Sequence, residues 1–411
     1  MTDGTGGANA PRRSVTYAGT YEQPYPRNAL IVAALRAAGY DVREIHVPVW
    51  ERVSDKSARF SGPRALVKLG GALLRAYVHL LPRVMRALPQ SDALVIGYIG
   101  QPDMLVLAPL AKLLGVPVIF NPLVTLTETL VDDRELVPHG SLAARLIAVI
   151  DALALRLANV LLVDTVESAW FSVTRFSVDP GRVVVVPVGA DERLFYPGVA
   201  EPGPNHAPPG PAGAPLRVLF YGKMIPLHGV ATVLRAAKLL EPEGVQFRVI
   251  GSGQESPAVS RLAKDLAVAN VDFTDWVPVE QLPSEIRRAD VVLGIFGTGD
   301  KAGRVVPNKV YQAMACGAAI VTRNSPAARA LLTDGESALL VPPGDPVALA
   351  DAVRSLRDPQ VRVRLGEGAR RAFERSAGLS VLAKRVAEAI DLAQSATHGR
   401  GCVAEPAPDG R

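Results

Sequence analysis

Apolar residues in the first half of the chain fall into short runs separated by longer amphipathic stretches. The short runs lie at 14–19, 40–48, 93–97, 116–121, 160–164 and 183–188, and they are typical of strands within a sheet. The stretches at 28–38, 103–114, 141–158 and 165–176 have the spacing of helices. Strands that alternate with helices predict a doubly wound parallel sheet.

A second series of the same kind begins at residue 216. Its predicted strands are 216–222, 246–251, 271–273, 291–296, 318–322 and 339–341. Its predicted helices are 230–240, 256–269, 280–288, 309–316, 346–356, 360–375 and 379–393. The repetition predicts an α/β protein with two domains, each built on a parallel sheet.

A change of composition marks the boundary between the two series. Residues 197–215 are dense in Pro and Gly, which is typical of an interdomain linker. We therefore predict a first domain at 14–196 and a second domain at 216–378. The helix at 379–393 is expected to finish the fold, and packing against the first domain is one arrangement open to it. Residues 1–13 and 394–411 are expected to be disordered.

Composition and charge argue against several classes of protein. The net charge of +5 over 411 residues is a mild excess that does not indicate nucleic-acid binding. Cys316 and Cys402 offer neither a disulfide framework nor the spacing of a metal site, so no metal is expected and a reducing cytoplasm fits. The first residues lack the apolar segment of a signal peptide, and no uncharged apolar run is long enough to span a membrane.

One segment of the first half is strongly basic. Residues 59–89 interleave Arg and Lys with Leu, Val and Tyr, and no Asp or Glu occurs between Asp55 and Asp92. A basic amphipathic segment can lie on an anionic membrane face, which would give a cytoplasmic protein a peripheral position on the inner face of the cell membrane. The alternative is an ordinary surface helix with a solvated basic face.

The stretch 291–322 carries the densest candidate chemistry. A buried strand leads into a loop with three glycines, a helix follows Pro307 and Asn308, and another strand follows Gly317, so the stretch predicts a βαβ unit. Ligands of parallel sheets bind beyond the carboxyl ends of the strands, and the start of a helix favours anions. Asn308 and Gln312 share a helix face and could hold sugar hydroxyls. A purely structural turn is the alternative.

Two more glycine turns follow strands of the second series. Gly222 ends the first strand, and Lys223 and His228 lie on the loop before the next helix, where cations would complete an anion site. Gly251 and Gly253 end the second strand. Three such turns at one sheet edge predict a cleft suited to a nucleoside diphosphate. In the first domain, the G-x-G-x-x-G pattern of dinucleotide binding is absent after the first strand, which argues against hydride transfer.

These motifs give the second half a resemblance to the large group 1 (family 4 type) retaining glycosyltransferases. The stretch 220–229, FYGKMIPLHG, resembles the family's G-R-x-x-x-x-K-G, with Lys223 at the Arg position and His228 at the Lys position. The stretch 251–253 matches its G-x-G turn, and QAMACG at 312–317 resembles its E-A-M-A-x-G. The resemblance implies the GT-B fold, in which two Rossmann-like, doubly wound domains face a central cleft.

The chain departs from the family at three positions. Arg304 and Gln312 stand where the family has two glutamates, and Asn121 lies roughly where it has an acceptor-side His. Together with the resemblance, the motifs predict that Lys223 and His228 hold the donor diphosphate, with Arg304 as a third cation. Other donor-binding residues are expected at Gly222, Gly251, Gly253, Val277, Gly303, Asn308, Lys309 and Gln312. On the acceptor side we expect the Gly19 loop and the stretch from Asn121 to Asp133, with Gly19, Asn121 and Glu128 as the candidate residues.

The resemblance implies an enzyme that moves a hexosyl group from a nucleotide sugar, with a UDP-sugar slightly favoured, and that retains the anomeric configuration. The donor phosphate would help to deprotonate the acceptor. The expected acceptor is lipid-linked, a polysaccharide or a natural product, in cell-envelope or secondary-metabolite biosynthesis. No cofactor besides the donor is expected. Two alternatives stay open: a GT-B partner subunit of weak activity, motivated by the missing glutamates, and a nucleotide-sugar epimerase.

Overall fold

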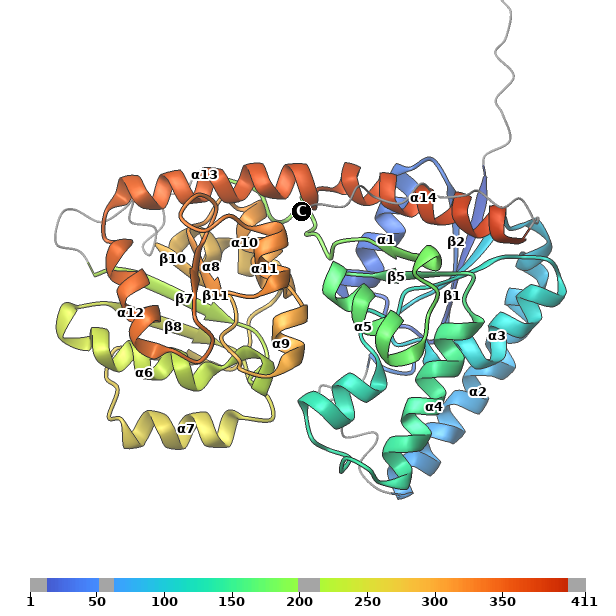
Figure 1. Ribbon diagram of the computed structural model, residues 1–411, viewed down its shortest axis with the longest axis horizontal. Helices are drawn as coiled ribbons and strands as arrows, with labels where there is room; N and C mark the ends of the chain where they lie inside the picture. Colours follow the sequence, from blue (N-terminus) through green and yellow to red (C-terminus); the bar gives the residue numbers. More distant parts are fainter. Residues whose placement is uncertain (1–12, 52–62, 199–214, 398–411) are drawn as a thin grey trace, which may run out of the picture.

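The structure is a computed structural model that describes residues 13–51, 63–198 and 215–397. It forms two lobes, each with a parallel sheet covered by helices on both faces (Figure 1). The two predicted sheets are therefore confirmed. Most of the predicted linker at 197–215 and of the termini at 1–13 and 394–411 lies outside the described residues.

The first sheet has the strand order β2-β1-β3-β4-β5-β6. Its strands are β1 (Ser14–Gly19), β2 (Asp41–His46), β3 (Ala93–Ile96), β4 (Val118–Phe120), β5 (Val160–Val163) and β6 (Val183–Val185). The helices of this lobe are α1 (Pro26–Ala37), α2 (Pro63–Ala87), α3 (Gln101–Leu113), α4 (Leu142–Leu157) and α5 (Val166–Phe176). Every residue of β3, β4 and β5 is buried, which explains why these strands are continuous apolar runs.

The second sheet has the order β12-β11-β10-β7-β8-β9. Its strands are β7 (Arg217–Tyr221), β8 (Gln246–Ile250), β9 (Val271–Thr274), β10 (Val291–Leu293), β11 (Ile320–Arg323) and β12 (Leu339–Val341). Its helices are α6 (Val230–Leu240), α7 (Ser256–Asp265), α8 (Leu282–Arg288), α9 (Asp300–Arg304), α10 (Asn308–Ala315), α11 (Pro326–Leu331), α12 (Pro346–Ser355) and α13 (Pro359–Ser376). Both sheets reverse their strand order beside the first strand, and each reversal leaves a crevice at the carboxyl ends.

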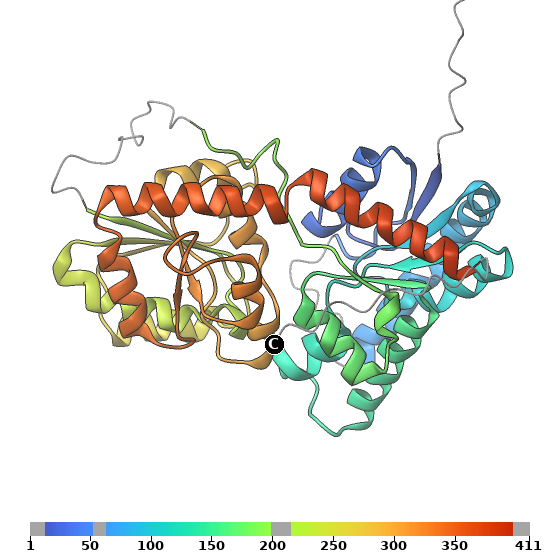
Figure 2. The same cartoon turned by 45° about the horizontal axis from the view of Figure 1, so that its top comes forward.

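The last helix, α14 (Leu379–Thr397), returns to the first lobe. Figures 1 and 2 show α13 on the second lobe and α14 on the first, running end to end across the molecule. The helix buries Leu382, Val386 and Ile390 in one apolar cluster with Leu35 of α1. Residues 394–397 are helical, so the tail predicted from 394 begins later than expected.

Two short α-helices of the described residues were not predicted. The helix α9 lies inside the predicted glycine loop, and α11 follows β11 with Ser325 as its cap, where the hydroxyl accepts from the N–H of Ala328. Helices of five and six residues are too short to show a helical period in the sequence. The strand β10 ends at Leu293, before the predicted end at 296, and a side chain at Gly294 would collide with Thr322 Oγ1.

Candidate active site

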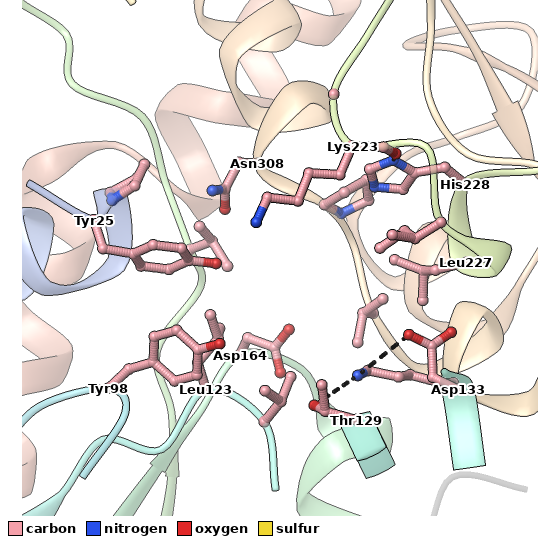
Figure 3. Close-up of a pocket in the computed structure, with 18 of the residues that line it drawn as sticks. Tyr25, Tyr98, Leu123, Thr129, Asp133, Asp164, Lys223, Leu227, His228 and Asn308 are labelled. Carbon is pink, nitrogen blue, oxygen red and sulfur yellow. Dashed lines mark hydrogen bonds and ion pairs between the residues drawn. The ribbon is translucent and has the colours of Figure 1, made fainter. Parts of the chain in front are cut away.

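A cavity of about 440 Å³ lies between the two lobes. Residues that follow β3, β4, β5 and β6 line it from the first lobe, and the loop after β7 and the start of α10 line it from the second. Figure 3 shows side chains of both lobes around a common space, among them Tyr98, Asp164 and Lys223. The arrangement is what two facing crevices of parallel sheets would produce.

Lys223 enters the cavity from the loop after β7. Its side chain is exposed, and its ammonium group points into the open space of Figure 3. The turn depends on Gly222, whose φ of +131° is rare for other residues. A Cβ atom at Gly222 would lie 3.1 Å from the ring of His228 and 3.2 Å from the side chain of Lys309. Glycine therefore lets two basic side chains approach the same loop.

His228 lies at the end of the same loop and is buried. Its Nδ1 is hydrogen-bonded to the carbonyl oxygen of Lys223. Since a carbonyl only accepts, Nδ1 carries the proton and Nε2 of the neutral ring has none. Burial and then the charge of Lys309 hold the pKa of His228 well below its ordinary value. The ring is therefore neutral in the ligand-free protein, whereas we predicted a cation.

Lys309 is the most unusual charged group of the cavity. Its side chain is only 4% exposed, and its Nζ is buried without a hydrogen-bond partner among the described residues. The ammonium lies 3.7 Å from the ring centroid of Phe220, which offers a cation–π contact. Burial holds the pKa of Lys309 well below its ordinary value. A buried, unpaired lysine beside a cavity is costly for the folded protein, which makes Lys309 a candidate for binding an anionic ligand.

The helix α10 begins at this cavity. Pro307 is its N-cap residue and Asn308 its first residue, so the helix begins one residue earlier than the predicted start at 309. Both residues line the cavity. Gln312 also lines it and is 7% exposed; its Oε1 accepts from the hydroxyl of Tyr221 at 3.0 Å. That contact leaves the amide nitrogen of Gln312 to donate to a ligand.

Several predicted donor residues lie outside the cavity lining. Gly251 has φ +142°, and a Cβ atom there would lie 1.9 Å from the carbonyl oxygen of Gly222. A Cβ atom at Gly253 would lie 2.6 Å from the carbonyl oxygen of Met224. These two glycines let the β7 and β8 turns pack together. Val277 packs against the second-lobe core, and Gly303 lies within α9.

Arg304 and Glu128 pair with each other across the two lobes. Arg304 Nη2 lies 3.0 Å from Glu128 Oε1, and its guanidinium stacks 4.3 Å from the ring centroid of Phe171. Thr165 also donates to the carbonyl oxygen of Arg304 at 2.6 Å. Neither member of the pair is among the residues that line the cavity. The pair thus forms a contact between the two lobes. Its geometry does not support the role predicted for Arg304 at the diphosphate or the role predicted for Glu128 at the acceptor.

The other two acceptor-side predictions, Gly19 and Asn121, also lie outside the cavity lining. Gly19, with φ +141°, allows Asp103 to approach, and Asn121 Oδ1 accepts from Arg27 Nε at 2.8 Å. Several residues of the predicted acceptor stretch at 121–133 do line the cavity, among them Leu123 and Asp133, whereas sequence reasoning missed Tyr25, Tyr98 and Asp164. An Asp directly after the buried strand β5 was a signal that could have identified Asp164.

Residues 215–358 match the protein-family model described as glycosyl transferases group 1. The match assigns the domain at 215–358 to the group 1 glycosyltransferases. It is 33% identical over 230 residues to a D-inositol 3-phosphate glycosyltransferase of Thermomonospora curvata, a match that covers 52% of each chain. Over 222 residues it is 32% identical to the protein with that name from Frankia alni, covering 51% of this chain and 53% of the relative. The chain thus spans about half the length of these relatives.

Two solved structures extend the likeness to both lobes. Sucrose-phosphate synthase from Thermosynechococcus elongatus superposes with a TM-score of 0.67 at 18% identity, covering 92% of this chain and 98% of that one. Anabaena Alr3699/HepE in complex with UDP and glucose gives 0.66 at 15% identity, with 92% and 99% covered. At such identities the likeness shows the fold alone, and that fold is GT-B, as predicted.

Proposed function

We propose that this group 1 glycosyltransferase transfers a sugar from a nucleoside diphosphate sugar to an acceptor, with retention at the anomeric carbon. The observation that carries the proposal is the convergence of Lys223 and Lys309 on one interlobe cavity. A departing nucleoside diphosphate develops negative charge, and preorganised cations lower the barrier to its departure. The N–H groups at the start of α10 add a favourable dipole.

A UDP-sugar is the donor we favour. Structures of the GT-B relative HepE carry UDP or UDP-glucose, which supports this choice of base by analogy. The amide of Gln312 would replace a family glutamate at the ribose, with Asn308 nearby for hydroxyl groups. The inositol 3-phosphate named for the curated relatives is not carried over as the acceptor, because the match spans only about half of each chain. Lipid-linked molecules, polysaccharides and natural products are the candidate classes of acceptor.

A thermal-shift screen with UDP, GDP, dTDP and ADP tests the proposal. We expect one nucleotide, UDP by preference, to stabilise the protein by about 2.7 kcal/mol at a hundredfold excess over its Kd. Replacement of the exposed Lys264 of α7 by Met is a matched control, because this lysine is not among the residues that line the cavity. The control should leave the shift unchanged. A protein that no nucleotide stabilises would contradict the proposal.

The same preparation separates the proposal from its alternatives. Transfer or slow hydrolysis of the preferred nucleotide sugar, followed by release of the nucleoside diphosphate, is expected of the transferase. Binding of the nucleotide sugar with neither reaction would favour a GT-B partner subunit of weak activity. That alternative is motivated by Arg304 and Gln312, which stand where the family has glutamates. Conversion of the donor sugar to its epimer would favour the epimerase.

We also propose that α2 contacts an anionic membrane surface. One side of α2 packs on the first lobe through buried residues such as Leu80 and Val84. Apolar and basic side chains alternate on its exposed side; they are Val67, Lys68, Leu74, Arg75, Val78, Arg83 and Arg86. The part of the basic segment at 59–62 lies outside the described residues. No described helix is both long enough and apolar enough to cross a membrane.

Sedimentation with lipid vesicles tests this surface. The protein is expected to sediment with phosphatidylglycerol vesicles at low salt and to be released as the salt concentration rises. The triple change of Arg75, Arg83 and Arg86 to Ser should weaken binding strongly, at about 1 kcal/mol for each charge. Phosphatidylcholine vesicles serve as the neutral control. Equal sedimentation of the wild type and the triple variant would rule the surface out.

A further inference from the structure

The helix α9 carries the second-lobe side of a contact between the two lobes. It lies inside the loop that follows β10, at the carboxyl edge of the second sheet. Figure 1 shows α9 facing α5 of the first lobe, away from the α13–α14 crossing at the top of the view. A contact at this place opposes a rotation of one lobe about that crossing.

Two ion pairs join α9 to η3 (Glu128–Asp133), a short π-helical segment of the first lobe. Arg304 Nη2 lies 3.0 Å from Glu128 Oε1, with the side chains 20% and 9% exposed. Lys301 Nζ lies 3.8 Å from Asp133 Oδ2, with the side chains 10% and 7% exposed. The two cations are three residues apart and share a face of α9, and the two carboxylates lie at the two ends of η3. The four charges therefore form two neutral pairs.

Neutral contacts accompany both pairs. Thr129 Oγ1 accepts from Lys301 Nζ at 3.2 Å. Thr165, the N-cap residue of α5, donates to the carbonyl oxygen of Arg304 at 2.6 Å. The guanidinium of Arg304 lies 4.3 Å from the ring centroid of Phe171. Arg304 is thus held by an anion, a hydroxyl and an aromatic ring, a combination that suits a planar guanidinium.

The segment η3 is also part of the cavity wall. Thr129, Leu130 and Asp133 line the cavity from the first lobe, and Lys301 lines it from the second. Figure 3 shows Thr129 and Asp133 at the edge of the open space, each joined by a dashed line to the same amino group. The position of α9 against η3 therefore sets the distance between this wall and the basic residues of the second lobe.

We propose that these two ion pairs form a clamp that holds the lobes closed in the ligand-free protein, so that both halves of the cavity are assembled before a nucleotide binds. Arg304 and Glu128 are positioning residues, since they do not line the cavity but fix the segment that does. Closure of the free protein goes beyond the function proposed above and does not depend on which nucleotide binds.

Loss or reversal of one charge in the clamp should open the lobes. The remaining charge would lie largely buried without a counter-charge, which is unfavourable in a protein interior. A rotation of the lobes would expose that charge to water and relieve the cost. The four side chains are at most 20% exposed, so salt should screen these pairs less than it screens pairs on the surface.

Small-angle X-ray scattering of the ligand-free full chain tests the clamp by charge reversal. Glu128→Lys places two cations together and should shift the closed-to-open ratio at least about tenfold toward the open form, which is seen as a larger radius of gyration. Arg304→Glu should do the same with two carboxylates. The double variant Glu128→Lys/Arg304→Glu restores opposite charges and should return to the wild-type curve.

The double variant also separates charge from local damage. It still lacks the contact of Glu128 Oε2 with Thr125, so its recovery would be due to the restored pair. Arg385→Gln is the matched control, because it breaks an exposed ion pair with Glu388 inside α14 and should leave the curve unchanged. A Glu128→Lys protein with the wild-type curve would overturn the inference, and so would a double variant as open as the single ones.

Catalysis gives a second readout, which rests on the proposed function. Glu128→Lys should lower kcat with the preferred nucleotide sugar by about 10- to 10²-fold, because the first-lobe wall is displaced. It should leave the thermal shift by the nucleotide as in the wild type, because Lys223, Lys309 and Gln312 all belong to the second lobe. An open variant with the wild-type kcat would overturn the positioning role. If no nucleotide stabilises the protein, the proposed function fails, whereas the scattering curves still decide the clamp.

Discussion

Replacement of Lys309 by Met is expected to stabilise the ligand-free protein and to abolish its stabilisation by nucleoside diphosphates. Lys309 is 4% exposed, and its Nζ has no hydrogen-bond partner among the described residues. Methionine has a similar length and no charge to desolvate, and it can keep the contact with Phe220. Relief of an unsatisfied buried group should raise the free energy of unfolding by about 1–3 kcal/mol.

The gain should depend on pH with a definite sign. Burial lowers the pKa of Lys309 in the folded protein, whereas the unfolded chain has the ordinary lysine pKa of about 10.4. The unfolded state therefore binds the proton more tightly than the folded state does. The wild type loses stability as the pH falls below the pKa of this lysine in the unfolded chain. The advantage of the variant should be large at pH 7 and should shrink as the pH approaches 10.

Urea unfolding at both pH values measures this effect, and the Lys264→Met variant serves as the control for a lysine outside the cavity. A Lys309→Met protein that is less stable than the wild type at pH 7, yet still stabilised by UDP, would show that Lys309 is a structural residue.

Replacement of Lys223 by Met is expected to lower kcat by about 10²–10³-fold, the usual effect of removing one preorganised donor from a developing anion. Lys223 is exposed, so the free energy of unfolding should change by no more than about 0.5 kcal/mol. Lys223→Arg should retain much of the activity, because the resembling family has Arg at this position and a guanidinium also pairs with phosphate.

Steady-state kinetics with the preferred nucleotide sugar distinguish the possible roles of Lys223. A fall in both kcat and kcat/KM indicates a contact made in the transition state, as the account requires. A raised KM with unchanged kcat would mean that Lys223 only holds the ground state, and wild-type kinetics would exclude it from the site.

The sequence predicted the second-lobe half of the site better than the first. The motif residues that line the cavity are Lys223, His228, Asn308, Lys309 and Gln312. They lie on the loop after a buried strand or in the first two turns of a helix, whose positions the hydrophobic pattern defines. Their roles toward a donor stay predictions. The neutral state of His228 depends on burial and on Lys309, which lies 81 positions away in the chain, and local pattern does not reveal it.

The three residues named on the acceptor side lie outside the cavity lining for a different reason. Gly19, Asn121 and Glu128 were chosen for their polarity or for their place after a strand, but each is used within the protein by Asp103, Arg27 or Arg304. The side chains that do face the cavity include two tyrosines and three aliphatic residues, which read as core in a sequence. The Arg304–Glu128 pair joins residues 176 positions apart and is visible only in three dimensions.

A crystal structure of the protein with UDP tests the central claim most directly. The account predicts that the diphosphate lies within hydrogen-bond distance of the Nζ atoms of Lys223 and Lys309, with its oxygens toward the first turn of α10. It also predicts the ribose beside Gln312. A cavity that stays empty at saturating UDP, or a UDP molecule bound elsewhere on the protein, would contradict the claim.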